Sequence, residues 1–179
     1  KKKKKPPASS SRTKKGEQTV LKSELPLLEG EVLDGMFMSC KAMRKFFSDA
    51  IEDCQNTGVM FSLHVKATMM KISHPIVFGH AVTIFYDDLF EKYGDLFKEI
   101  GVNPNNGLSS VLEKIKSLPE SKQEEIQEVL HACYEHRPEI AMVDSVKGIT
   151  NLHVPSDVIV DASMPAMIRN SGKMWARDG

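Results

Sequence analysis

The chain has 179 residues, of which 41% are hydrophobic, and a formal net charge of zero. This length allows one large domain or two small ones, and no apolar run approaches the roughly 20 residues that a bilayer-spanning helix requires. Three cysteines fit neither a disulfide framework nor a metal site of the C-x-x-C type, so we expect a reducing compartment, the cytoplasm or the mitochondrial matrix, rather than secretion.

The zero net charge hides an uneven distribution. Residues 1–15 carry eight basic and no acidic side chains, which leaves 16 basic against 24 acidic residues in 16–179. This head contains Pro6, Pro7 and a serine run. It has too few apolar residues to fold by itself, and it lacks the apolar central region of a secretory signal peptide. We expect residues 1–15 to form a disordered basic tail and residues 16–179 to form the folded part. Binding of the tail to nucleic acid or a membrane is the less favoured alternative.

The first elements are a short β-like run at 19–21, a turn at 29–31 and a helix. Ser39 is a credible N-cap for this helix, its apolar residues keep helical spacing, and Gly58 is its expected end. Residues 59–65 then alternate between apolar and mixed positions, which predicts a strand.

Lys66 follows this strand at its carboxyl end, on the same face as His64. In α/β proteins ligands bind at that end, where the loops open into a crevice. With a lowered pKa, Lys66 could act as an acid or base. From the residues alone, an ordinary solvated ammonium is the simpler interpretation.

The second half of the chain alternates helices and strands. Apolar spacing predicts helix over 76–100 with a break near Asp87 and Asp88, a turn cluster at 101–107, and helices over 108–116 and 119–136. Residues 140–143 and 157–160 are expected to be strands. The order predicts an α/β fold with helices layered on a mixed sheet.

Three polar residues near the C-terminus are candidates for a site. Asp161 directly follows the predicted strand 157–160, where a carboxylate suits Mg²⁺; capping the short helix 165–169 is the alternative and the simpler one. His153 could ligate a metal or orient a substrate, although an isolated histidine is more often structural. Arg169 could bind a carboxylate or phosphate, or end a helix. No glycine-rich dinucleotide motif is present.

Longer strings carry more information than these single residues. They include Phe61-Ser-Leu-His-Val-Lys-Ala-Thr-Met-Met-Lys71, Gly101-Val-Asn-Pro-Asn-Asn-Gly107 and the whole of residues 147–175. Together they resemble the monomeric type of NADP-dependent isocitrate dehydrogenase, in uninterrupted order over residues 16–179. The resemblance implies part of the larger α/β domain of such an enzyme; for the basic head we expect no counterpart.

The resemblance also implies a reaction, the oxidative decarboxylation of isocitrate to 2-oxoglutarate with NADP and Mg²⁺ or Mn²⁺. Lys66 matches the family's lysine that contacts isocitrate and takes part in acid-base chemistry, and Asp161 matches a metal-ligating aspartate. The other metal carboxylates, a tyrosine, the serine, asparagine and arginine that hold the substrate, and the segments that bind NADP have no match here. We therefore expect the chain alone to be inactive.

Two non-enzymatic hypotheses remain beside this one. The chain could be an inactive, dehydrogenase-derived structural or interaction subunit of a larger assembly, anchored by its basic arm. Binding of nucleic acid through the same arm is the weaker hypothesis, and it predicts an affinity that falls steeply with salt.

Overall fold

The chain is divided into two compact units, unit 1 (Lys1–Met38) and unit 2 (Ser39–Gly179), which we describe separately. The computed structural model describes residues 9–12, 18–35, 37–65, 70–155 and 168–178. Within these ranges, no helix is both long enough and apolar enough to span a membrane.

Unit 1 contains one small antiparallel sheet. Strand β1 (Ser9–Arg12) pairs with β2 (Gln18–Lys22), with a register shift after Ser9. Strand β2 confirms the run expected at 19–21, whereas β1 lies inside the segment expected to be a disordered tail. Backbone pairing accounts for the difference, because a ladder satisfies N–H and C=O groups without requiring apolar side chains.

Helix α1 (Cys40–Thr57) opens unit 2 and confirms its sequence signals. The Oγ atom of Ser39 accepts a hydrogen bond from the backbone N–H of Ala42 at 3.3 Å, which satisfies one of the free donors of the first turn. The helix ends at Gly58 with a left-handed φ of 66°. Its buried side chains are Phe47 and Ile51.

Helices α2 (Ser73–Phe85) and α3 (Asp87–Glu99) are separated at Tyr86, whose φ of −109° and ψ of 39° are not helical. The expected break near Asp87 is therefore confirmed, and Pro75 lies in the first turn of α2, where its missing N–H costs no helical hydrogen bond. Helix α2 is the most buried helix of the unit. Its buried residues are Phe78, Gly79, Ala81, Val82, Ile84 and Phe85.

The predicted turn cluster contains a short 3₁₀ helix, η1 (Pro104–Asn106), which packs against α2. The approach is close, because a Cβ atom on Gly79 would lie 2.0 Å from Oδ1 of Asn105. Asn103 begins η1, with its Oδ1 accepting from the N–H of Asn105 at 3.1 Å. Helices α4 (Leu108–Ile115) and α5 (Glu120–His136) follow within one residue of their predicted starts.

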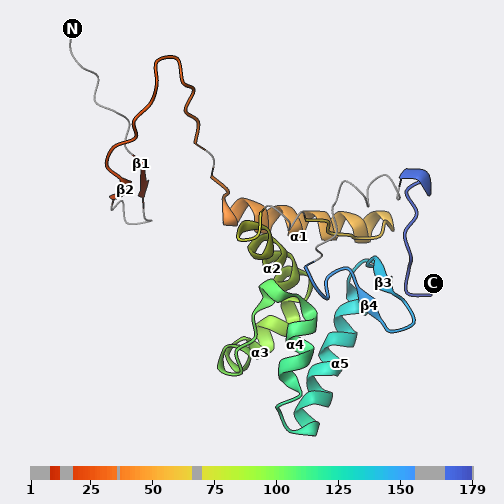
Figure 1. Cartoon of the computed structure of the whole chain (residues 1–179). Helices are drawn as coiled ribbons and strands as arrows, with labels where there is room; N and C mark the ends of the chain where they lie inside the picture. The colour runs from red at the N-terminus through yellow and green to blue at the C-terminus, as the bar shows by residue number, and fades with distance from the viewer. Residues whose placement is uncertain (1–8, 13–17, 36, 66–69, 156–167, 179) are drawn as a thin grey trace. The chain divides into compact units, whose positions relative to one another are not determined.

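Two further short strands, β3 (Met142–Asp144) and β4 (Ile149–Thr150), form an antiparallel pair. Figure 1 shows this pair beside the C-terminal part of α5, with α1 across the same end of the group formed by α2 to α5. The helices therefore surround a core to which β3 and β4 are attached at one end.

The expected mixed sheet with layered helices is wrong for the described residues, which form five α-helices and two separate two-stranded sheets. In residues 59–65 only Phe61 pairs, through an isolated parallel bridge to Ile140. Alternating hydrophobicity specifies an extended backbone but not a partner strand. Here the N–H of Leu63 donates to the side chain of Asn151, whereas in a sheet it would donate to a backbone carbonyl. The expected strand 157–160 lies outside the described residues.

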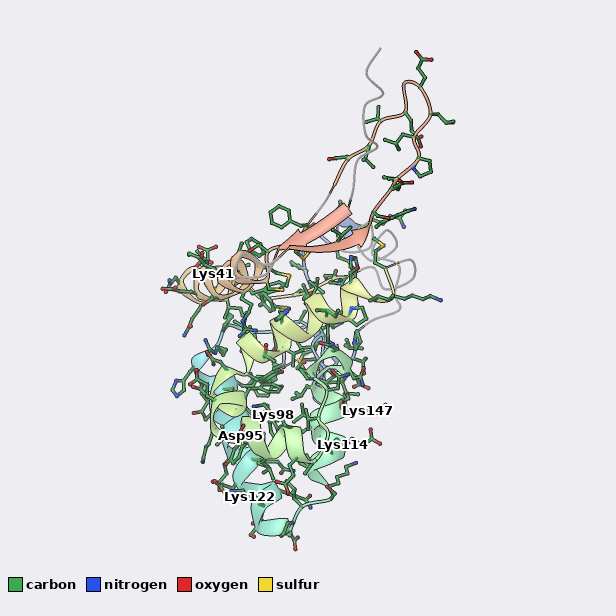
Figure 2. The ribbon with its side chains drawn as sticks, turned by 90° about the vertical axis from the view of Figure 1, so that its left-hand side faces the viewer. Lys41, Asp95, Lys98, Lys114, Lys122 and Lys147 are labelled. Carbon is green, nitrogen blue, oxygen red and sulfur yellow. The ribbon has the colours of Figure 1, made fainter. Side chains whose placement is uncertain are left out.

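A polar cluster joins α5 to α3. The Oε1 atom of Glu125 accepts from the Tyr93 hydroxyl at 2.7 Å and lies 3.1 Å from Nζ of Lys92, while Oε2 accepts from Nζ of Lys122 at 2.6 Å. The hydrogen bond from Lys122, followed by those from Tyr93 and Lys92, lowers the pKa of Glu125 to about 2. Figure 2 shows Lys122 in the group formed by α2 to α5, well away from Lys41 of α1.

We predict that Glu125→Gln destabilises the chain at neutral pH by an amount that shrinks in acid. Because the folded-state pKa lies below the ordinary value of 4.5, the ionised carboxylate stabilises the fold fully above that value. This contribution is lost as the pH falls toward 2. Urea unfolding between pH 7 and pH 2.5 measures it, with the exposed Glu128→Gln as the control on the same helix. A constant difference between wild type and Glu125→Gln would contradict the prediction.

Candidate functional site

Three stretches of unit 2 that are distant in sequence meet beside β3. The N–H of Phe61 donates to the carbonyl of Glu139 at 2.7 Å, and the N–H of Ala141 donates to the carbonyl of Phe61 at 2.9 Å. The N–H of Met142 then donates to the carbonyl of Trp175 at 3.0 Å. Backbone bonds thus connect residues from two of the strings that carried the family resemblance.

The C-terminal stretch is also attached to α5. The guanidinium carbon of Arg177 lies 5.0 Å from the centroid of the Tyr134 ring, within the range of a cation–π contact. The Tyr134 hydroxyl in turn lies 2.8 Å from that of the fully buried Tyr86. Burial raises the pKa of both tyrosines, so both remain neutral hydrogen-bonding groups over the physiological range.

A cavity of about 570 Å³ lies where these stretches meet. One wall comes from the residues that follow α1 and the other from the C-terminal stretch. The lining residues are Val59, Met60, Ser62, His64, Gly172, Lys173 and Met174. Three polar side chains, Ser62, His64 and Lys173, therefore line a largely apolar hollow just before Lys66 in the chain, a combination that is typical of small-molecule sites.

His64 is the last described polar side chain before Lys66. Its Nε2 atom lies 2.7 Å from the Oγ atom of Ser62, on the same face of the extended segment. This contact fixes the plane of the imidazole and leaves its Nδ1 atom free of any other hydrogen bond within the described residues. The expected position of Lys66 on this same face lies outside the described residues and stays a prediction.

His153 is a structural residue. It is 7% exposed, and its Nδ1 accepts hydrogen bonds from the backbone N–H of Thr150 at 2.8 Å and from the Thr150 hydroxyl at 2.9 Å. Burial lowers the pKa of His153, so the neutral ring is favoured, with its proton on Nε2. Of the roles considered for this residue, the structural one fits these contacts.

Leu152 and His153 also accept hydrogen bonds from the first N–H groups of helix α4. Gly107 has no side chain to cap this helix, and the N–H groups of Leu108 and Ser109 donate instead to the carbonyls of Leu152 and His153, at 3.0 and 2.9 Å. Leu152 is fully buried. The segment that leads toward Asp161 is therefore fixed to the core until His153.

Arg169 lies in a smaller cavity of about 370 Å³. Its neighbours there are the adjacent residues Asn170, Ser171, Lys173, Met174 and Trp175. The two cavities share Lys173 and Met174, so the basic side chains of Arg169 and Lys173 belong to one region. No sequence signal pointed to Lys173 except its place in the family string 147–175.

The two principal candidates, Lys66 and Asp161, lie outside the described residues, and their roles stay predictions. Among the side chains that the structure describes, no three from histidine, cysteine, aspartate and glutamate come together as metal ligands. The described residues alone therefore do not fit a metal, and any metal site depends on Asp161 and on groups beyond them. The three cysteines, Cys40, Cys54 and Cys133, are free thiols.

Asn151 links two of these stretches, a role that sequence analysis did not give it. Its Oδ1 accepts from the N–H of Leu63 at 2.6 Å, and its own N–H donates to the carbonyl of Ala141 at 2.8 Å. The only sequence signal was its place inside a family string, since a contact across 88 residues leaves no local pattern. This amide joins the stretch before Lys66 to the stretch before Asp161.

The comparison with known proteins matches more of the chain than residues 16–179, the range expected from the resemblance. The sequence model of the family described as "Monomeric isocitrate dehydrogenase" matches residues 3–179. The match therefore includes most of the basic head, for which no counterpart was expected.

Individual relatives agree with the family match. "Isocitrate dehydrogenase [NADP] 2" of Psychrobacter sp. (strain 13A) is 64% identical over 164 residues, and the protein of the same name from Mycobacterium tuberculosis is 64% identical over 166 residues. "Isocitrate dehydrogenase [NADP]" of Azotobacter vinelandii is 54% identical over 166 residues. These matches cover 92–93% of this chain but only 22% of each relative. The chain belongs to the monomeric isocitrate dehydrogenase family.

Proposed function

We propose that this chain is a portion of an NADP-dependent isocitrate dehydrogenase that contributes substrate-side and metal-side residues to a site completed elsewhere. The observation that carries the proposal is the 64% identity to proteins named as such enzymes, maintained over nearly the whole chain. The bonds that join Phe61 to residues 139–141, Leu63 to the side chain of Asn151, and Met142 to Trp175 support it, because they link the family strings.

In this proposal the hydride on the hydroxyl-bearing carbon of isocitrate passes to NADP⁺, and the carboxylate beta to the new ketone leaves as CO₂. A divalent cation, when bound, supplies Lewis-acid polarisation of substrate oxygens. Lys66 contacts the anionic substrate and exchanges a proton with it. Lys173 and Arg169 add positive charge near the cavity beside residues 59–64, which favours approach of a tricarboxylate.

Exposed apolar side chains in unit 1 support the proposal that the complete enzyme contains further protein. Val32 and Phe37 are each 91% exposed, and Leu28 is 82% exposed. These side chains would be covered if further protein packed on unit 1, as large exposed apolar surfaces often are. A reducing compartment, such as the bacterial cytoplasm, suits the three free thiols.

The proposal is tested by segment exchange. In the relative from Mycobacterium tuberculosis, the matching 166 residues are replaced by those of this chain, to give what we call the exchanged enzyme. We expect it to reduce NADP⁺ in the presence of isocitrate and Mn²⁺, whereas the 179-residue chain alone does not. A folded exchanged enzyme without turnover would refute the proposal and favour an inactive structural subunit.

Asp161→Asn in the exchanged enzyme is expected to weaken metal binding before it affects the chemical step. Loss of one anionic ligand lowers the affinity of a site for a hard divalent cation, since such cations prefer carboxylate oxygens. We expect the Mn²⁺ concentration for half-maximal activity to rise by about 10- to 100-fold, with rate recovered at high Mn²⁺. Direct Mn²⁺ binding by calorimetry measures the same loss without turnover. An unchanged affinity would leave Asp161 as a helix cap.

A further inference from the structure

The backbone N–H of Leu63 has an unusual partner for an extended segment. Its neighbour Phe61 makes both of its backbone bonds with residues 139–141, as a strand does. At Leu63 that ladder stops, and the N–H donates instead to a side chain, Oδ1 of Asn151, at 2.6 Å. An amide donor requires an acceptor, so this geometry also fixes which end of the Asn151 amide faces Leu63.

Asn151 is itself held firmly. Its N–H donates to the carbonyl of Ala141 at 2.8 Å. The flanking residues Thr150 and Leu152 are 3% and 0% exposed, and Thr150 is bonded to His153. The side-chain carbonyl is therefore preorganised by a backbone that belongs to the core, and it loses little conformational entropy in making the bond.

The bond connects the two parts of the chain on which the proposed function depends. Leu63 lies three residues before Lys66, and Asn151 lies ten residues before Asp161. Apart from this amide, the hydrogen-bonded contact between the two stretches is the bridge at Phe61, two residues farther from Lys66. Leu63 and Val65 also pack against the hydrophobic core, so among the described residues the amide is the last hydrogen bond that fixes the backbone of this segment before Lys66.

We propose that Asn151 is a positioning residue for the reaction of this family. Its side-chain carbonyl sets the place of the segment leading to Lys66 relative to the segment leading to Asp161. This inference rests on the proposed function, and it assigns Asn151 no contact with substrate, cofactor or metal. Loss of the bond frees Leu63 and the residues after it, and displacement of a reacting group by about 1 Å can cost about 10²-fold in rate.

The test compares Asn151→Leu with Asn151→Asp in the exchanged enzyme. Leucine keeps the approximate shape of asparagine but has no acceptor, whereas aspartate keeps an oxygen at the Oδ1 position. We expect Asn151→Leu to lower kcat by about 10- to 100-fold and to speed hydrogen exchange of the Leu63 amide. Asn151→Asp is expected to recover the slow exchange and most of the rate. The exchange measurement needs no substrate or metal.

Asn103→Ala is the matched control, because it also removes an asparagine oxygen that accepts a backbone N–H, here from Asn105. It is expected to change thermal stability but neither kcat nor exchange at Leu63. In a Lys66→Met background, Asn151→Leu should cost almost no further rate, since it acts through Lys66.

Three results would overturn the inference. The first is an unchanged kcat in Asn151→Leu despite fast exchange at Leu63, and the second is an equal loss of kcat in Asn103→Ala. The third is full additivity with Lys66→Met. Absence of turnover in the parent exchanged enzyme would instead refute the proposed function and, with it, the positioning role.

Discussion

Replacing Lys66 by Met in the exchanged enzyme lowers kcat by about 10² to 10⁴-fold, the usual contribution of one acid-base group, and changes Mn²⁺ affinity far less. Methionine keeps a long unbranched side chain but has no proton to transfer. If Lys66 exchanges a proton with the substrate, the pH dependence of kcat should also lose the limb that its titration contributes. Steady-state kinetics at saturating isocitrate, with Mn²⁺ binding measured separately, tests both parts.

Lys41→Met is the control for this substitution. Lys41 is exposed near the start of α1, and Figure 2 shows it at the margin of the helical group. The same loss of one charge there should leave kcat and KM near their starting values. If Lys66→Met instead raised KM for isocitrate at an unchanged kcat, Lys66 would bind the substrate without taking part in proton transfer.

Gly107→Ala is expected to lower the free energy of unfolding by about 3–5 kcal/mol. Gly107 has a φ of 81° and a ψ of −177°, a combination that is essentially restricted to glycine. A Cβ atom there would lie 2.2 Å from the carbonyl oxygen of His153 and 3.0 Å from that of Leu152. Since these carbonyls accept the first N–H groups of α4, relief of the clash breaks the bonds that begin the helix.

Gly94→Ala is the matched control for the glycine substitution. Gly94 lies inside α3, its φ is not positive, and no atom would lie within 4 Å of an added Cβ. Alanine should therefore stabilise the chain by about 0.5–1 kcal/mol through its higher helix propensity. Urea unfolding followed by circular dichroism compares the two variants. Similar stabilities for both would show that the backbone at Gly107 adapts at low cost.

Local signals predicted the helices of unit 2 well. Ser39 and Gly58 bound α1 as expected, and the charged pair at Asp87 and Asp88 marked the start of α3. Caps and helical spacing depend on residues within one or two turns, so a sequence contains all the necessary information.

Strand pairing was predicted poorly, because pairing depends on distant residues. The alternation in 59–65 identified an extended segment, but nothing near Phe61 indicates its single bridge to Ile140. Nor does the polar run of β1 indicate its pairing with β2. Asn151 was missed for the same reason, since its acceptor role depends on Leu63. Lys66 and Asp161 were found through family strings, and their roles await the variants described above.

The way in which α4 begins has a consequence for how the chain acquires its structure during synthesis. The carbonyls that accept its first N–H groups belong to Leu152 and His153, which leave the ribosome well after the helix itself. Until they emerge, the first turn of α4 has only water to satisfy those donors. We therefore expect α4 to settle late in translation, in step with the arrival of the segment that precedes Asp161, so that stalling before Leu152 leaves a protease-sensitive nascent chain.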